Sequence, residues 1–283
     1  MCRVNVWNRR TATVVAGALP VVVLVSLVGL PTVPGTDIDL TVPYAAEGEG
    51  PTFNTLGDVD GTPVVDVTGA QTDETSGNLN MTTVSVRTRL SLSQALGRWI
   101  TSDDTIVPLE QVIPSNTSPE DVQRQNAAAF AASESNATVA AMNHLGKPLE
   151  TMVAGVNDDS PASGAVKEND IITAVDGPSA GLMFSLAVVD KLSPGELSGG
   201  RFIAGTGTID ADGSVGPIGG ITHKIAAAAH AGAEAFLVPE GNCAEATSRG
   251  YDGDPTLIKV SSLDQAVDEL DTFTSGGSPT TCG

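Results

Sequence analysis

The chain has 283 residues, and 41% of them are hydrophobic, which is enough for one or two domains with a hydrophobic core. The formal net charge of −20 excludes the basic surface with which proteins bind nucleic acids, so we expect no nucleic-acid partner. The 31 glycines and 17 prolines predict many turns between the secondary-structure elements.

The N-terminal region contains an apolar stretch, residues 14–30, that is rich in valine and leucine. The stretch is long enough to cross a bilayer as a helix, and no A-x-A-like cleavage site follows it. Because arginines precede it and acidic residues follow it, the positive-inside rule places the rest of the chain outside the cytoplasm. We therefore expect residues 1–35 to be a basic cytoplasmic start and a single-pass anchor in the cell membrane, with the remainder extracytoplasmic. The alternative is a cleaved signal peptide, which has the same order of features.

The first half of the remaining chain combines strands and helices. Alternation of apolar and polar residues predicts strands in segments 37–42, 63–69 and 79–86. A short amphipathic helix is expected over residues 90–100. A longer helix is expected over residues 119–145, with Ser118 as its N-cap and Gly146 at its end.

The second half alternates helices and strands more regularly. We expect helices over residues 179–192, 222–231 and 262–270, and strands within residues 200–210, 213–220 and 233–240. The residues from Thr274 onward are rich in Ser, Gly and Thr, which predicts a flexible tail. This alternation indicates an α/β or α+β layered fold.

The sequence offers little for metal or nucleotide chemistry. Its three histidines, His144, His223 and His230, do not form an H-E-x-x-H motif, and no paired C-x-x-C occurs. A G-x-x-x-x-G-K-[ST] loop is also absent from the sequence, so ATP is not implied. We expect no cofactor.

Ser179 and Lys224 are the candidates for nucleophilic catalysis. Ser179 lies at a corner between a strand and a helix, where backbone N–H groups can bind a tetrahedral oxyanion. Lys224 lies in a helix of small apolar residues, whose close packing would desolvate the amine and lower its pKa enough for it to act as a base. Two alternatives remain at this point. Ser179 could only cap its helix while Lys224 faces solvent, or a Ser-His-Asp triad could use His223 or His230.

The motifs around these residues form a wider pattern: "DGPSAG" (residues 176–181), "TGTI" (206–209) and "PIGG" (217–220), with Lys224 four residues after the last glycine. This pattern resembles the proteolytic domain of Lon proteases, which are Ser-Lys peptidases. The resemblance implies an α+β Lon-type fold, with Ser179 as the nucleophile and Lys224 as the general base. It also implies supporting roles for Thr206, which would hydrogen-bond the lysine, and for Gly177 and Ala180 beside the serine. The family tends to form hexamers, so a homo-oligomer is implied as well.

The fuller chain resembles a narrower group, the bacterial membrane-anchored Lon-like proteases with a PDZ domain and no ATPase module. Residues 151–177 resemble the middle of a PDZ domain but are too few to bury a core of their own, so we expect an incomplete PDZ-like remnant. Residues 36–150 would then be strands and helices associated with the protease. Residues 178–273 would form the proteolytic core, and residues 274–283 the flexible tail.

Two functional hypotheses follow from this resemblance. The first is a membrane-anchored, ATP-independent serine endopeptidase that hydrolyses unfolded or flexible polypeptides. The second is a catalytically impaired, membrane-tethered binding or scaffold protein that retains the protease fold. Cys243 and Cys282 would both lie outside the cytoplasm, where they either form a disulfide or remain free thiols.

Overall fold

The computed structural model describes residues 9–67, 70–113, 119–147, 149, 151–152, 171–172, 179–253 and 255–283. The chain divides into two compact units. The first comprises Met1–Gly48 and Ser85–Thr117, and the second comprises Glu49–Val84 and Ser118–Gly283. Strands β1 (Tyr44–Asn54) and β4 (Asn78–Arg87) contribute residues to both units.

The first unit contains mainly short elements. Besides parts of β1 and β4, it contains α1 (Arg9–Val28), α2 (Leu92–Thr101), β5 (Thr105–Pro108) and α3 (Leu109–Val112). β5 pairs antiparallel with the start of β1, from Tyr44 opposite Pro108 to Glu47 opposite Thr105. Helix α2 confirms the short helix expected around residues 90–100, and Ser91 is its N-cap.

The expected membrane anchor is not found. Throughout the residues that the structure describes, no helix combines the length and the apolar character needed to cross a membrane. Helix α1 begins with two arginines and ends at Val28, so its apolar part is limited to residues 14–28. At 1.5 Å per residue this part spans only about 22 Å, against a hydrocarbon core of about 30 Å, and it contains Pro20. The prediction of a transmembrane helix before the α+β fold is therefore wrong, and so is the predicted single-pass location in the cell membrane with an extracytoplasmic catalytic domain.

The second unit is built on parallel strands. Strand β4 pairs parallel with β8 (Phe202–Gly205), β8 with β11 (Ala235–Pro239), and β11 with β12 (Thr256–Val260). The complete order of hydrogen-bonded strands is β12-β11-β8-β4-β1-β5. Because β5 is antiparallel to β1 whereas the other named pairs are parallel, the sheet is mixed, and the fold is α+β.

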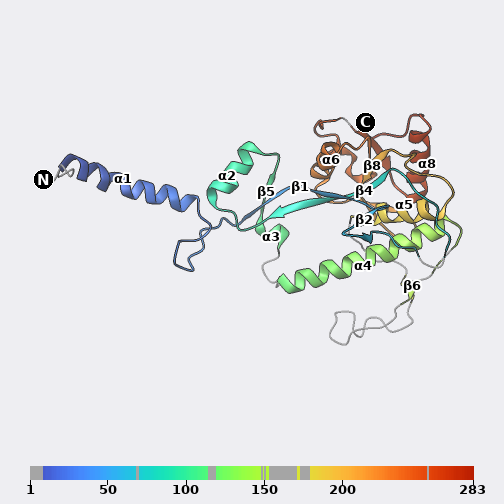
Figure 1. Ribbon diagram of the computed structural model, residues 1–283, viewed down its shortest axis with the longest axis horizontal. Helices are drawn as coiled ribbons and strands as arrows, with labels where there is room; N and C mark the ends of the chain where they lie inside the picture. Colours follow the sequence, from blue (N-terminus) through green and yellow to red (C-terminus); the bar gives the residue numbers. More distant parts are fainter. Residues whose placement is uncertain are drawn as a thin grey trace. The chain divides into compact units, whose positions relative to one another are not determined.

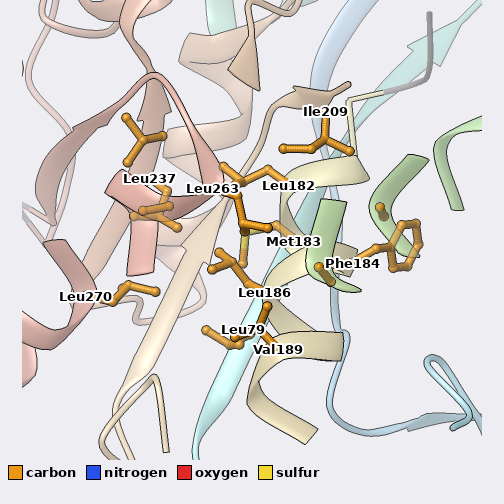
Figure 2. Close-up of a cluster of buried hydrophobic side chains, with 14 of the residues drawn as sticks. Leu79, Leu182, Met183, Phe184, Leu186, Val189, Ile209, Leu237, Leu263 and Leu270 are labelled. Atoms are coloured by element: carbon orange, nitrogen blue, oxygen red, sulfur yellow. The ribbon is translucent and has the colours of Figure 1, made fainter. Parts of the chain in front are cut away.

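Helix α5 (Gly181–Leu192) is the centre of the main hydrophobic core. Ten consecutive residues from Gly181 to Asp190 are buried, as expected for a helix that is apolar on nearly all sides. Figure 2 shows its side chains among those of β4, β11 and α8 (Leu263–Thr274); the labelled residues of these four elements are Leu182, Met183, Phe184, Leu186, Val189, Leu79, Leu237, Leu263 and Leu270. Helix α4 (Pro119–His144) lies beside α5 (Figure 1), and the rings of Phe130 and Phe184 meet edge to face with centroids 5.5 Å apart.

A second core cluster lies around α6 (Ile221–His230). Its buried residues Ile221, Ile225 and Ala228 pack with Phe236 and Val238 of β11. The alanines Ala226, Ala227 and Ala229 of this helix are also buried, and their small side chains allow close packing. Gly232, with φ of 91°, follows the helix at the position where the sequence predicted its end.

The C-terminal residues differ from the expected flexible tail. Lys259 N donates a hydrogen bond to Thr280 O (2.9 Å), and Cys282 N donates to Leu257 O (3.0 Å), so these residues run along β12. A disulfide joins Cys243 to Cys282. The prediction of a flexible tail failed because amino-acid composition alone reveals neither a disulfide nor hydrogen bonds to a neighbouring strand.

Several strands also differ from the sequence-based expectation. Residues 37–42 form no strand. Of the expected strand 63–69 the structure describes residues 63–67, and among these only Pro63 belongs to a strand, the short β3 (Thr62–Pro63), which pairs with β2 (Asp58–Val59). Strand β1 was missed because "YAAEGEGPTFN" contains glycines, glutamates and a proline, all of which are uncommon in strands. Tertiary pairing overrides this weak propensity. At Gly50, a Cβ would lie 2.4 Å from Thr83 Oγ1, so the close approach of β4 requires a glycine.

The expected PDZ-like remnant, residues 151–177, lies outside the described residues except for two short strands. These are β6 (Thr151–Met152) and β7 (Ile171–Ile172), which pair antiparallel.

Candidate active site

Ser179 lies just before Ala180, the N-cap residue of α5, and its backbone is held in place through its carbonyl group. Its carbonyl oxygen accepts hydrogen bonds from Gly207 N (2.8 Å) and from Thr206 Oγ1 (3.0 Å). The N-cap residue of α5 is Ala180, and no side chain caps the helix. Ser179 is therefore not the helix cap that the plainer interpretation of the sequence suggested, and its hydroxyl group is available for other contacts.

That hydroxyl group contacts Lys224. Lys224 Nζ donates hydrogen bonds to Ser179 Oγ (2.6 Å) and to Thr206 Oγ1 (3.0 Å). Lys224 lies in the first turns of α6, where its N–H donates to Gly220 O (3.2 Å). The fold thus brings together three of the residues singled out in the sequence, which come from the start of α5, the end of β8 and the start of α6.

The amine of Lys224 is buried, and burial changes its acidity. The residue is 3% exposed, and no acidic side chain in the described part of the chain forms an ion pair with it. Burial disfavours the charged form and lowers the pKa of Lys224 from 10.5 to about 8. About a tenth of the lysine is therefore neutral at pH 7, and the neutral form dominates above pH 8.

A cavity of about 350 Å³ opens beside this pair. Its walls come from β4, α4 and the loop before α6, and the lining residues are Met81, Thr82, Thr83, Val84, Phe130, Ser179, Ala180, Gly219 and Lys224. Ala180, expected to support the site, is buried and forms part of this wall. Gly177, the other residue expected beside the serine, lies outside the described residues.

The sequence did not indicate the walls formed by β4 and Phe130. These residues lie far from Ser179 in the chain and carry no chemically distinctive side chain, so only the fold brings them to the site. The sequence gives no sign that these residues line a cavity, because apolar residues in a strand or helix are ordinarily part of a core.

The histidines considered for a triad have other surroundings. His230 Nδ1 is 2.8 Å from Glu49 Oε2, and the side chain is half exposed. His144 Nδ1 is 2.5 Å from Asp264 Oδ1. His223 is buried within α6. Over the described ranges, no group of three or more His, Cys, Asp or Glu side chains could bind a metal ion.

Comparison with known proteins relates part of the chain to one family. Residues 164–269 match the family model described as "Lon protease (S16) C-terminal proteolytic domain". The match begins within the stretch expected to be PDZ-like and includes Ser179, Thr206 and Lys224.

Curated relatives include Lon proteases from archaea and bacteria. The chain is 34% identical over 95 residues to the archaeal Lon protease of Halobacterium salinarum, which covers 33% of this chain and 13% of that protein. It is 35% identical over 97 residues to the Lon protease of Orientia tsutsugamushi (33% and 12%) and 32% identical over 96 residues to Lon protease 2 of Bacillus subtilis (34% and 17%). The chain thus matches less than a fifth of the length of each of these relatives. Within the chain, residues 164–269 are thus similar to the C-terminal proteolytic domain of Lon proteases (S16).

Proposed function

We propose that this protein is a Lon-type serine endopeptidase that hydrolyses unfolded or flexible polypeptides without ATP, with Ser179 as nucleophile and Lys224 as general base. The observation that carries this proposal is the 2.6 Å distance between Lys224 Nζ and Ser179 Oγ in a buried setting that lowers the pKa of the lysine. A serine needs an adjacent base to become a nucleophile, and a lysine can serve as that base only when it is neutral.

In the proposed reaction, neutral Lys224 takes the proton of Ser179 Oγ while the oxygen attacks the carbonyl carbon of the peptide bond. In this proposal, backbone N–H groups at the start of α5 that have no partner within the helix bind the resulting oxyanion. The lysine then gives its proton to the leaving amine, the C–N bond breaks, and an acyl ester forms on Ser179. A water molecule, deprotonated by Lys224, hydrolyses this ester and restores the serine hydroxyl group.

Thr206 has an orienting role in this proposal. Its hydroxyl group accepts a hydrogen bond from Lys224 Nζ (3.0 Å) and donates one to Ser179 O (3.0 Å). The threonine is fully buried, so both hydrogen bonds are shielded from water. It thereby fixes the lysine relative to the backbone that carries the nucleophile.

The expected substrates are polypeptides that are already unfolded. The cavity beside Ser179 is large enough for a side chain, and its Met, Val and Phe walls favour an apolar one. The sequence contains no P-loop that would supply energy for unfolding. The alternative remains a catalytically impaired binding or scaffold protein that retains the protease fold. The membrane tether is no longer part of that alternative.

Hydrolysis of casein by the full chain tests the proposal. We expect Ser179→Ala and Lys224→Ala each to lower kcat/KM by at least about 10³-fold, because the two residues act as one unit. Matched controls are Ser185→Ala, since Ser185 is buried in α5 and its hydroxyl group donates to Gly181 O, and Lys191→Ala, since Lys191 Nζ donates to Val65 O. A fluorophosphonate serine probe should label the wild type but not Ser179→Ala. Equal hydrolysis by all five proteins would contradict the roles proposed for Ser179 and Lys224, and no hydrolysis by the wild type would favour the scaffold alternative.

A further inference from the structure

Asn242 makes an unusual two-point contact with a loop close to the site. Its Oδ1 accepts a hydrogen bond from Ile218 N (2.9 Å), and its Nδ2 donates one to Ile218 O (2.9 Å). The residue is 5% exposed and ends the short helix η1 (Glu240–Asn242). One side-chain amide thus satisfies both backbone groups of a single residue, which fixes the orientation of that residue as well as its position.

The loop that Asn242 binds consists of residues 217–220 and leads directly into α6. Gly219 of this loop lines the cavity beside Ser179. Gly220 has φ of 67°, and a Cβ there would lie 2.8 Å from Val84 Cγ2, so the loop packs tightly against β4. Gly220 O in turn accepts the hydrogen bond from Lys224 N. A displacement of this loop would therefore displace the backbone of Lys224.

Asn242 is itself firmly anchored. The next residue, Cys243, forms the disulfide with Cys282, whose N–H bonds Leu257 O in β12. On the other side, a Cβ on Gly241 would lie 3.2 Å from Pro217 Cβ, so the two segments are in close contact. The asparagine therefore connects the 217–220 loop to a part of the chain that is tied covalently and by backbone bonds to the sheet.

We propose that Asn242 is a positioning residue for the Ser179–Lys224 pair, because its two hydrogen bonds to Ile218 fix the loop that sets the first turn of α6. This inference rests on the proposed function. The 2.6 Å distance between Nζ and Oγ leaves little tolerance, and a displacement of about 1 Å in a reacting geometry can cost about 10²-fold in rate. The amide of Asn242 supplies one donor and one acceptor to Ile218 at the same time.

The test is Asn242→Asp in the full chain. Aspartate retains the acceptor for Ile218 N, but it removes the donor and sets a carboxylate against Ile218 O. We expect kcat to fall about 10- to 100-fold with KM within about threefold, since the cavity walls on β4 and α4 remain. We also expect the acid limb of the pH–rate profile to move upward from pH 8, because a displaced Lys224 regains contact with water.

A matched control separates positioning from general stability. The amide of Gln265 also bonds backbone in another segment, accepting from Ser261 N (3.0 Å) and donating to Lys259 O (3.5 Å), away from Lys224. Gln265→Glu should lower the melting temperature yet leave kcat and the pH–rate profile unchanged. If Asn242→Asp does not fold, Asn242→Ala, which introduces no charge, takes its place with the same measurements.

One measurement does not depend on turnover. The pKa of Lys224 can be followed by NMR in protein labelled with ¹³C and ¹⁵N at lysine, with Lys224→Arg used for assignment. If the wild type neither hydrolyses casein nor reacts at Ser179, the proposed function fails, while a higher Lys224 pKa in Asn242→Asp still supports positioning. Unchanged kcat, pH–rate profile and Lys224 pKa in a folded Asn242 variant would overturn the inference.

Discussion

Helices α2 and α6 are both ten residues long, but different interactions stabilise them. Helix α2 has a capping box, in which Ser91 Oγ accepts from Gln94 N and the Gln94 side chain accepts from Ser91 N, and none of its residues is buried. Helix α6 has no side-chain cap, since Gly220 precedes it, and eight of its residues are buried. The first helix is specified by its own sequence and the second by its surroundings.

The difference matters because α6 carries the proposed general base. A capping box stabilises a helix but leaves its position to other contacts. Packing on the sheet, by contrast, fixes a helix in position, because a close-packed core resists displacement. The lysine thus lies on the helix whose location is the more tightly constrained of the two.

The largest expected difference between the helices concerns their apolar side chains. Ile225 of α6 is fully buried, and Ile225→Ala should lower the free energy of unfolding by about 2–5 kcal/mol through the cavity that it leaves. Leu96 of α2 is 45% exposed, and Leu96→Ala should change this free energy by about 0.5 kcal/mol or less. Urea unfolding of both variants measures the contrast, and equal losses would contradict it.

Substitution of Lys224 is expected to have a smaller effect of the opposite sign, an increase in the free energy of unfolding. Because burial lowers its pKa from 10.5 to about 8, the protonated lysine destabilises the fold by about 3 kcal/mol below pH 8. Lys224→Met should therefore raise the free energy of unfolding by about 1–3 kcal/mol at pH 7, after the loss of the bonds to Ser179 and Thr206 is subtracted. This variant should show no hydrolysis.

The pH dependence provides the check on this prediction. Between pH 8 and 10.5 the unfolded chain binds the Lys224 proton more strongly than the folded chain does, so the stability of the wild type should rise with pH. Lys224→Met should lack this component of the rise. Identical pH–stability curves for the two proteins would show that the lysine is not desolvated.

The smallest effect is expected at the cap of α2. Ser91→Ala removes the Oγ that accepts from Gln94 N and should cost about 1 kcal/mol of helix stability. Thr101→Ala, which removes only a bond to Gly97 O at the exposed end of the same helix, is the control and should cost less than about 0.5 kcal/mol. Thermal unfolding followed by circular dichroism measures both, and a neutral Ser91→Ala would show that α2 does not depend on its own cap.

Features encoded locally were predictable from the sequence. The end of α4 before Gly146 and the Ser262 cap of α8 are confirmed, because a glycine with positive φ and a serine cap act within a few residues. Strand β1 was not predicted, because its pairing with β4 and β5 outweighs an unfavourable composition. The apolar stretch at the N-terminus was misinterpreted because hydropathy alone did not show where the helix begins and ends.

In the candidate site, too, some residues were predictable from the sequence and others were not. Ser179, Thr206 and Lys224 were recognisable because each carries a reactive group within a motif, and the fold brings the three together. The contact between Asn242 and Ile218 was not recognisable, because it joins an ordinary amide to backbone atoms 24 residues away. Contacts of this kind are specified only by the folded chain.

The residues that follow α8 have a consequence for solubility. Strand β12 ends the strand order of the sheet, and an uncovered strand in that place offers its backbone N–H and C=O groups to any other extended chain, which is a route to aggregation. Thr280 and Cys282 occupy those groups, and the disulfide to Cys243 keeps them there. The C-terminal segment therefore protects the sheet against intermolecular pairing, a benefit that is independent of the chemistry at Ser179.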